Sequence, residues 1–233
     1  MSRDTTVIVP VRKGSQRIIH KNIRPVAGFR YGLMEIKLRQ LLATGVFDQI
    51  LVDTDLEEMG EMMDYITGGV PDPRVRVEPR DPRLAGSDAT TDDLIRHLVT
   101  KVRTTHMVWT HVTSPFFTAE CYRRFMTAYH ERPETADSLV AVDVLREFLW
   151  TKGGPMNYDR SKLRWPFTQT LEPVYLINSA AFAIPVELAR KVGDRLGDSP
   201  AFFECETFEG FDVDWPAQFQ VVESLVKNGY PVL

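Results

Sequence analysis

Short apolar runs alternate with segments of helical periodicity along this chain, and that alternation limits the possible folds more than any other feature. An apolar run of about four to eight residues predicts a buried strand, and apolar side chains spaced about 3.6 residues apart predict a helix. Strands that alternate with helices form a parallel sheet with helices on both faces. The predicted strands cover residues 5–10, 49–54, 75–78, 106–111, 138–142 and 174–184, and the predicted helices cover residues 32–44, 56–66, 91–102, 119–130 and 216–228. The sequence therefore predicts an α/β fold with a mostly parallel sheet.

Length and regularity indicate a single domain. The chain has 233 residues, and open α/β sheets of up to about 250 residues fold as one unit. Residues 145–173 interrupt the alternation, because they carry Trp and Phe side chains and a Gly153–Gly154 pair without clear periodicity. We expect one domain over residues 1–233, from which residues 145–173 leave the sheet as an insert.

Composition excludes two classes of partner. The net charge is −4, which gives no basic footprint for nucleic acid or for an anionic membrane. No apolar run reaches the roughly 18 residues of a membrane span, and the apolar stretch at the N-terminus is too short for a signal peptide. Cys121 and Cys205 lie far apart without metal-ligand spacing, which suits buried thiols in a reducing compartment. We therefore expect a cytoplasmic protein that binds neither nucleic acid nor a membrane.

The loop after the first predicted strand, residues 10–22 (PVRKGSQRIIHKN), concentrates charged and small residues. These are Arg12, Lys13, Gly14, Ser15, Arg17 and Lys21. Ligands of open α/β sheets bind at the carboxyl ends of the strands. Glycine lets backbone N–H groups approach phosphate oxygens there, and cations neutralise phosphate charge. The loop lacks the GxxxxGK[ST] pattern of a P-loop. It predicts a phosphate site of another kind, with a solvated turn as the alternative.

Two aspartates near the C-terminus form a second candidate site. Asp212 and Asp214 alternate in an apparent short strand, which places their side chains on one face. Neighbouring carboxylates repel each other unless a cation is present, and hard oxygen ligands suit Mg²⁺. The alternative is a helix cap, because Asp214 lies just before the helix that starts at Pro216. Asp55 and Thr91 have the same ambiguity, since each is either a cap or a nucleotide contact.

The segment at residues 10–22 resembles the N-terminal signature of acylneuraminate (CMP-sialic acid) synthetases and related CMP-sugar-acid synthetases, P-A-R-G-G-S-K-R-I-P-x-K-N. The matching positions are Pro10, Arg12, Gly14, Ser15, Arg17, Ile18, Lys21 and Asn22. Further segments resemble the family's motifs, and they follow in the family's order. These segments are residues 52–55, Arg80 with residues 84–91, residues 113–115, residues 138–142, Gln169 with Asn178, and Asp212 and Asp214 with Phe219 and Glu223. The resemblance thus covers nearly the whole chain.

This resemblance implies a Rossmann-like sheet of the nucleotidyltransferase type. The implied reaction transfers CMP from CTP to a sugar acid, a sialic acid-like nonulosonate, and releases pyrophosphate. Mg²⁺ is the implied cofactor, held by Asp212 and Asp214. The implied assembly is a homodimer in which residues 145–173 form the dimerisation insert and cross to the neighbour's active site.

The resemblance also implies roles for single residues. The implied catalytic residues are Arg12 and Lys21 at the triphosphate and Asp214 at the metal. The implied nucleotide-binding residues are Arg12, Gly14, Ser15, Gln16, Asn22, Arg80, Ala89, Thr91 and His111. The implied acceptor-binding residues are Gln169, Asn178 and Phe182.

Departures from the family's motifs leave two alternatives open. Gln16 replaces a lysine that faces the triphosphate, Thr168 replaces an arginine beside Gln169, and Gln218 replaces a third aspartate. A cytidylyltransferase for a different acid, such as a phosphonate, would be compatible with these changes. A non-catalytic relative that only binds nucleotide would be compatible as well. Because the expected acceptor pocket contains departures, the sequence does not select the acceptor.

Overall fold

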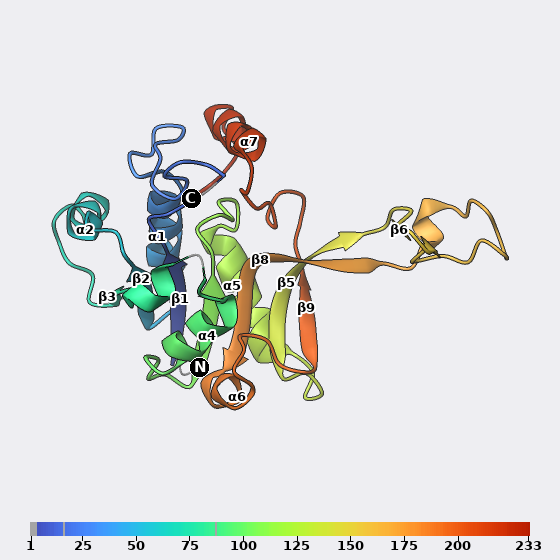
Figure 1. Ribbon diagram of the computed structural model, residues 1–233, viewed down its shortest axis with the longest axis horizontal. Coiled ribbons are helices and arrows are strands. Elements are labelled where there is room, and N and C mark those ends of the chain that lie inside the picture. Colours follow the sequence, from blue (N-terminus) through green and yellow to red (C-terminus); the bar gives the residue numbers. More distant parts are fainter. Residues whose placement is uncertain (1–3, 16, 87) are drawn as a thin grey trace.

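The computed structural model describes residues 4–15, 17–86 and 88–233, and a seven-stranded sheet organises them (Figure 1). The strands of this sheet are β1 (Thr5–Val11), β2 (Gln49–Thr54), β3 (Val75–Pro79), β4 (His106–Thr110), β5 (Ser138–Leu145), β8 (Val174–Pro185) and β9 (Pro200–Glu204). The helices are α1 (Gly32–Thr44), α2 (Met59–Thr67), α3 (Pro82–Ala85), α4 (Thr91–Val99), α5 (Ala119–Glu131), α6 (Val186–Val192) and α7 (Pro216–Lys227). Among the described helices, none combines the length and the apolar character that a bilayer span requires.

The strand order of the sheet is β3-β2-β1-β4-β8-β5-β9. Its pairings are parallel except those of β8, which runs antiparallel to β4 and β5. The predicted α/β fold with a mostly parallel sheet is therefore confirmed. From β1 the chain builds β2 and β3 on one side and returns to β4 on the other side. Open α/β sheets bind ligands at such a switch in strand order, beyond the carboxyl ends of the strands.

Helices bury both faces of the sheet. In β1, Val7, Val9 and Val11 pack in a cluster with residues of α1, α5 and α7, whereas Ile8 packs in a second cluster with residues of α4 and α6. A strand that is covered on both faces has no polar side, which explains the continuous apolar run of β1. Burial of one such side chain contributes about 1.5–3 kcal/mol. The sheet thus gives a rigid base to the loops at its carboxyl edge.

The strands β5 and β8 continue beyond the rest of the sheet and form the stem of an arm, drawn in yellow and orange in Figure 1. A bulge in β5 shifts the register, after which residues 142–145 pair with residues 174–177. Residues 146–173, nearly all of the expected insert, lie at the far end of this stem, outside the seven-stranded sheet. They contain the short strands β6 (Trp150–Thr151) and β7 (Gly154–Pro155) and the 3-10 helix η1 (Thr168–Thr170).

Aromatic side chains pack together at the end of the arm. The ring of Phe148 contacts the rings of Tyr158 and Trp165, each at a centroid distance of 5.2 Å. Much of the apolar surface nevertheless stays exposed, with 64% of Trp165 and 78% of Phe167 accessible to solvent. The arm therefore presents aromatic side chains away from the core of its own chain.

Outside the arm, three elements are not predicted by the sequence pattern: α3, α6 and β9. Both helices are too short, with four and seven residues, to show a helical period. The strand β9 pairs only with β5 at the sheet edge and is only partly buried, so it lacks the apolar run of a central strand. The helix α2 begins at Met59 rather than at residue 56, because the N–H of Leu56 donates to the Thr54 hydroxyl in a turn.

Candidate active site

A cavity of about 620 Å³ lies at the carboxyl ends of β1 and β4. Its wall combines the loop after β1, residues between 80 and 94, the end of β4, Ser179 of β8 and the segment before α7. The predicted site residues that line it are Arg12, Gly14, Ser15, Lys21, Asn22, Arg80, Ala89, Thr91, His111, Asp212 and Asp214. Gln16 lies outside the described residues. The fold therefore gathers most of the predicted nucleotide and metal residues around one space.

Asn22 and Asp55 hold the loop after β1 in place. The side-chain amide of Asn22 donates to the carbonyl oxygen of Arg12 at 3.0 Å. The N–H of Lys13 donates to Oδ1 of Asp55 at 2.5 Å. Asp55 does not cap α2, which begins only at Met59 and has no side-chain cap. The Arg12 side chain is exposed and has no carboxylate partner among the described residues.

Asp214 faces the cations of the same loop. Its Oδ1 lies 3.1 Å from Nζ of Lys21 and 3.2 Å from a guanidinium nitrogen of Arg17. Lys21 also donates to the carbonyl oxygen of Val213 at 2.7 Å. The capping alternative for Asp214 is wrong, because the N-cap residue of α7 is Trp215. The side chain of Gln218 accepts the N–H groups of Asp214 and Trp215 just before the helix, at 2.7 and 2.8 Å. The carboxylate of Asp214 is therefore available to the cavity.

Asp212 carries a buried carboxylate oxygen without a partner. Its Oδ1 has no hydrogen bond within the part of the chain that the structure describes. Burial raises the pKa of Asp212, and the nearby charge of Asp214 raises it further, while a hydrogen bond with Thr113 opposes both effects. The described residues contain no group of three or more His, Cys, Asp or Glu side chains that could hold a metal ion.

The opposite wall is built around a buried ion pair. The Nε of Arg80 lies 2.6 Å from Oδ2 of Asp53, and the guanidinium also donates to the Asp53 carbonyl oxygen at 3.3 Å. Arg80 thus ties the segment after β3 to the end of β2. Ala89 and Thr91 line the cavity beside it. The cap of α4 is Thr90, whose hydroxyl accepts the N–H of residue 93 at 3.1 Å, so the capping role expected for Thr91 belongs to its neighbour.

His111 has a fixed protonation state. Its Nε2 lies 3.1 Å from Nε1 of Trp109 and 2.8 Å from Nη1 of Arg195, and both of these nitrogens are donors. Nε2 is therefore the acceptor, and the imidazole proton resides on Nδ1. Burial, together with the positive charge of Arg195, lowers the pKa of His111 to about 3. The imidazole stays neutral at physiological pH.

Arg195 is a charged cavity residue that sequence reasoning missed. It lies between α6 and β9, in a loop that carries no recognisable motif. Its guanidinium carbon lies 4.0 Å from the ring centroid of Phe182 and 5.5 Å from that of Trp109. Only packing across distant segments brings Arg195 to the cavity, so no local sequence signal could have identified it.

The three residues expected to bind the acceptor do not line the cavity. Gln169 is exposed on η1, at the end of the arm. Phe182 is 3% exposed and belongs to the core beneath Arg195. Asn178 is 6% exposed, and its amide donates to Oδ1 of Asp143 at 3.1 Å and to Sγ of Cys205 at 3.2 Å. Asn178 and Phe182 are therefore buried behind the cavity wall of their own chain.

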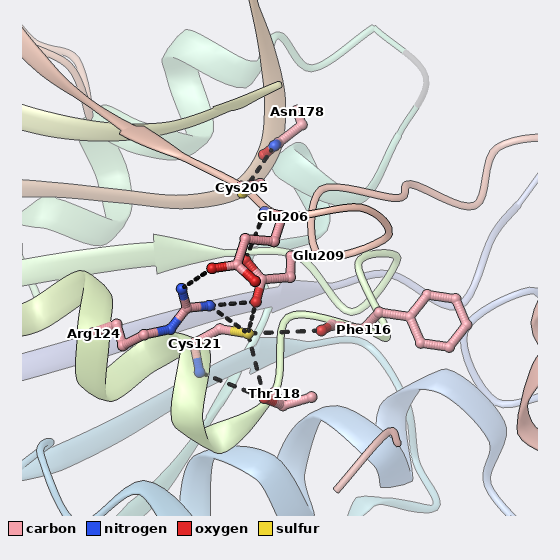
Figure 2. Close-up of polar contacts among 8 residues, drawn as sticks. All are labelled: Phe116, Thr118, Cys121, Arg124, Asn178, Cys205, Glu206 and Glu209. Carbon is pink, nitrogen blue, oxygen red and sulfur yellow. Dashed lines mark hydrogen bonds and ion pairs between the residues drawn. The ribbon is translucent and has the colours of Figure 1, made fainter. Parts of the chain in front are cut away.

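A polar cluster anchors the segment that leads to Asp212 and Asp214 (Figure 2). Arg124 of α5 pairs with Glu206 at 3.2 Å and also with Glu209, and the Cys121 thiol donates to Glu209 at 3.3 Å. Burial raises the pKa of Cys121 and raises that of Cys205 to about 12. The thiols are therefore protonated at neutral pH. The cluster joins α5 to the segment after β9, which continues to the two aspartates.

Comparisons with known proteins agree with this geometry. The model of the cytidylyltransferase family matches residues 6–154. Three solved structures are similar over nearly the whole chain. CMP:2-keto-3-deoxy-manno-octonic acid synthetase complexed with CTP has a TM-score of 0.65 and 14% identity, with 96% of this chain and 98% of that chain covered. 4-Diphosphocytidyl-2C-methyl-D-erythritol synthase from Anaerococcus prevotii has a TM-score of 0.68 and 10% identity, with 96% of each chain covered. 2-C-methyl-D-erythritol 4-phosphate cytidylyltransferase from Thermus thermophilus has a TM-score of 0.55 and 15% identity, with 95% and 98% covered.

These identities establish a common fold and no more. No curated protein matches the sequence significantly.

Proposed function

The chain belongs to the cytidylyltransferase family, whose members are CTP-dependent nucleotidyltransferases, and on that premise we propose that it transfers CMP from CTP to a sugar acid and releases pyrophosphate. The match is to the family as a whole. The narrower resemblance to acylneuraminate synthetases rests on the motifs quoted above. A sialic acid-like nonulosonate is the acceptor class that this resemblance implies, and the departures in the expected acceptor pocket keep a different acid as the alternative.

The observation that carries this proposal is the distribution of charge around the cavity. Arg12 and Lys21 line it from one loop, beside Gly14, where an added Cβ would meet open space. Asp212 and Asp214 line the same cavity from the segment before α7. Cations and a glycine backbone suit a triphosphate. Carboxylates would repel the triphosphate, so their presence in the same cavity supports a bound cation between them and the phosphates.

The chain's residues fit the binding of Mg²⁺. Mg²⁺ is commonly held by one or two carboxylates together with substrate phosphates, and Asp212 offers an oxygen that no described residue satisfies. Asp212 and Asp214 would hold the ion. When bound, Mg²⁺ neutralises charge on phosphate oxygens. Lys21 donates two of its three N–H groups to Val213 and Asp214, which leaves one for a phosphate oxygen.

The proposed reaction is an in-line displacement. The anomeric hydroxyl oxygen of the acceptor forms a bond to the α-phosphorus of CTP, and the bond from that phosphorus to the α,β-bridging oxygen breaks. Pyrophosphate leaves, and the hydroxyl proton passes to water, since Nε2 of His111 already accepts from two donors. Arg12 and Lys21 hold the triphosphate and neutralise the charge that develops on the leaving group. Positioning and electrostatic stabilisation supply most of the catalysis in reactions of this kind.

The arm supports a proposal about assembly. Its aromatic side chains are exposed within one chain, and Gln169 lies among them, outside the cavity of its own protomer. We propose a twofold homodimer in which residues 145–173 reach the neighbour's cavity, so that Gln169 contacts the acceptor bound there. Light scattering at micromolar concentration tests this assembly. A dimer is the expected result, and a monomer would contradict it.

Pyrophosphate release tests the proposed function directly. Purified protein is incubated with CTP, Mg²⁺ and a panel of α-keto sugar acids, sugar phosphates and phosphonates. Release that requires one of the sugar acids supports the proposal. If pyrophosphate is released only with a sugar phosphate or a phosphonate, that compound class is the acceptor instead of a sugar acid. Tight CTP binding without release for any acceptor would instead indicate a nucleotide-binding protein without catalysis.

A further inference from the structure

The charges that line the cavity do not all have partners within the protein. Arg80 pairs with Asp53, and Arg17 and Lys21 share Asp214. Arg195 has no carboxylate within ion-pair distance among the described residues, although it is partly buried and lines the cavity. Burial of an unpaired charge is unfavourable. A cation that is kept partly buried at a cavity wall therefore indicates an anion that arrives with a ligand.

The guanidinium of Arg195 is held in a fixed orientation. One of its nitrogens donates to Nε2 of His111 at 2.8 Å, and its carbon lies over the ring of Phe182, 4.0 Å from the ring centroid. His111 is itself fixed by the donor of Trp109 at 3.1 Å. An arginine has five N–H donors, and among the described residues no acceptor takes those on Nε and Nη2 of Arg195. These donors are the pair that binds a carboxylate or a phosphate in a bidentate manner. Burial lowers the pKa of Arg195 to about 10, so it remains charged at neutral pH.

Arg195 lies on a different part of the sheet from the triphosphate loop. Arg12 follows β1, whereas Arg195 packs on Trp109 of β4 and Phe182 of β8. The order β1-β4-β8 separates β1 from β8 by two strand spacings, or about 10 Å. Ser179 of β8 also lines the cavity. Two unpaired cations, Arg12 and Arg195, thus lie toward two sides of one cavity, which suits two separate anionic groups.

We propose that Arg195 is the specificity residue of the acceptor subsite and binds the anionic group of the acceptor, a carboxylate or a phosphate, while His111 positions its guanidinium. This assignment rests on the proposed function, because it takes the triphosphate to lie against Arg12 and Lys21. It adds a residue outside the motifs that the sequence shares with acylneuraminate synthetases. It also gives a cation to an acceptor site in which Thr168 replaces an expected arginine.

The test is equilibrium binding, which needs no turnover. Isothermal titration measures three probes on protein saturated with an α,β-methylene analogue of CTP, whose bridge cannot break. The probes are a nine-carbon α-keto sugar acid, its methyl ester and a hexose phosphate. Wild type should bind at least one anionic probe about 10- to 100-fold more tightly than the neutral ester. The acid and phosphate arms identify which anion Arg195 selects.

Variants assign that preference to Arg195. Arg195→Gln should lower the affinity for the preferred anion to that of the ester, and Arg195→Lys should recover part of it. Affinity for the CTP analogue should stay within about twofold of wild type. Arg190→Gln is the matched control, because Arg190 lies on α6, donates to the carbonyl oxygen of Val102 and does not line the cavity. It should bind every probe as wild type does.

Several outcomes would overturn the assignment. In the first, Arg195→Gln loses affinity for the CTP analogue instead of for the anionic probe. In the second, Arg195→Gln binds all probes as tightly as wild type does. In the third, wild type binds neither anionic probe more tightly than the ester. The melting temperature of Arg195→Gln with the CTP analogue shows whether the variant is folded, and Arg195→Lys replaces it if it is not. Should wild type bind the acid through Arg195 yet release no pyrophosphate from CTP, the proposed reaction fails while the assignment of Arg195 stands.

Discussion

The two ends of the cavity are built in different ways. At the proposed triphosphate end, Arg12, Arg17 and Lys21 come from one loop, and Asp214 neutralises two of them. At the proposed acceptor end, His111 and Arg195 come from segments far apart in the sequence, and the cation has no carboxylate partner within the part of the chain that the structure describes. The first end groups cations that suit a triphosphate on one loop. The second end uses contacts that depend on how distant elements pack, so it can change without changing the nucleotide site.

The largest effect should follow from Asp214→Asn. Asparagine keeps the size of the side chain but removes the charge that would hold Mg²⁺ and that now faces Lys21 and Arg17. Turnover should fall by about two orders of magnitude, as is typical for loss of one strong electrostatic element. The melting temperature should barely change, because the N-cap residue of α7 is Trp215 and not Asp214. Activity within about threefold of wild type would show that the triphosphate end does not depend on this carboxylate.

A matched pair of loop variants tests which cation meets the triphosphate. Arg12 lines the cavity, whereas the neighbouring Lys13 does not and lies 3.9 Å from Glu57. Arg12→Gln should raise KM for CTP by about tenfold or more, since a charge-assisted hydrogen bond contributes about 1.5–3 kcal/mol. Lys13→Gln should leave KM unchanged. Steady-state kinetics at constant ionic strength measures both, and equal effects of the two variants would contradict the placement of Arg12.

A smaller effect is expected from Lys37, which lies beneath the cavity. Its ammonium is fully buried and donates to the carbonyl oxygens of Ser114 and Phe117 and to the Tyr122 hydroxyl, at 3.0, 3.2 and 3.0 Å. These carbonyls directly follow the cavity segment at residues 111–113. Burial lowers the pKa of Lys37 from 10.5 to about 7. Lys37 thus holds in place the segment that continues from the cavity wall at residues 111–113.

The lowered pKa of Lys37 predicts a pH dependence of stability. Between pH 7 and 10.5 the unfolded chain binds more protons than the folded chain at this side chain. The free energy of unfolding should therefore rise with pH across that window, by up to about 1.4 kcal/mol per pH unit, and the penalty should be fully present below pH 7. Urea unfolding at pH 7, 8 and 9 measures the rise. Lys37→Met should remove it, and an equal rise in wild type and variant would contradict the assignment.

The sequence predicted the central part of the fold well. The helix at residues 32–44 and the strand at residues 49–54 have the predicted bounds, because buried elements must present apolar side chains in a regular pattern. One of the two edge strands, β9, escaped prediction for the converse reason. The strand β9 pairs on one side only and leaves Phe202 45% exposed. Because it is only partly buried, it does not need the continuous apolar run by which a buried strand is recognised.

The candidate site divides in the same way. The loop of Arg12 and Lys21 and the aspartates at 212 and 214 could be predicted, because each set is local in sequence and reaches one cavity. Arg195 could not, since its contact with His111 joins segments 84 residues apart. Single-residue capping roles were unreliable as well. The N-cap residues lie one position away from the expected ones, at Thr90 rather than Thr91 and at Trp215 rather than Asp214.

A thermal shift comparison among nucleotides tests the central claim that this cavity is a CTP site with a distinct acceptor end. A ligand that binds only the folded chain stabilises it by RT ln(1 + [L]/Kd), or about 2.7 kcal/mol at 100 times Kd. With Mg²⁺ present, CTP should raise the melting temperature by several degrees, and ATP and GTP at the same concentration should raise it far less. Equal shifts for the three nucleotides would contradict the cytidine assignment and, with it, the division of the cavity.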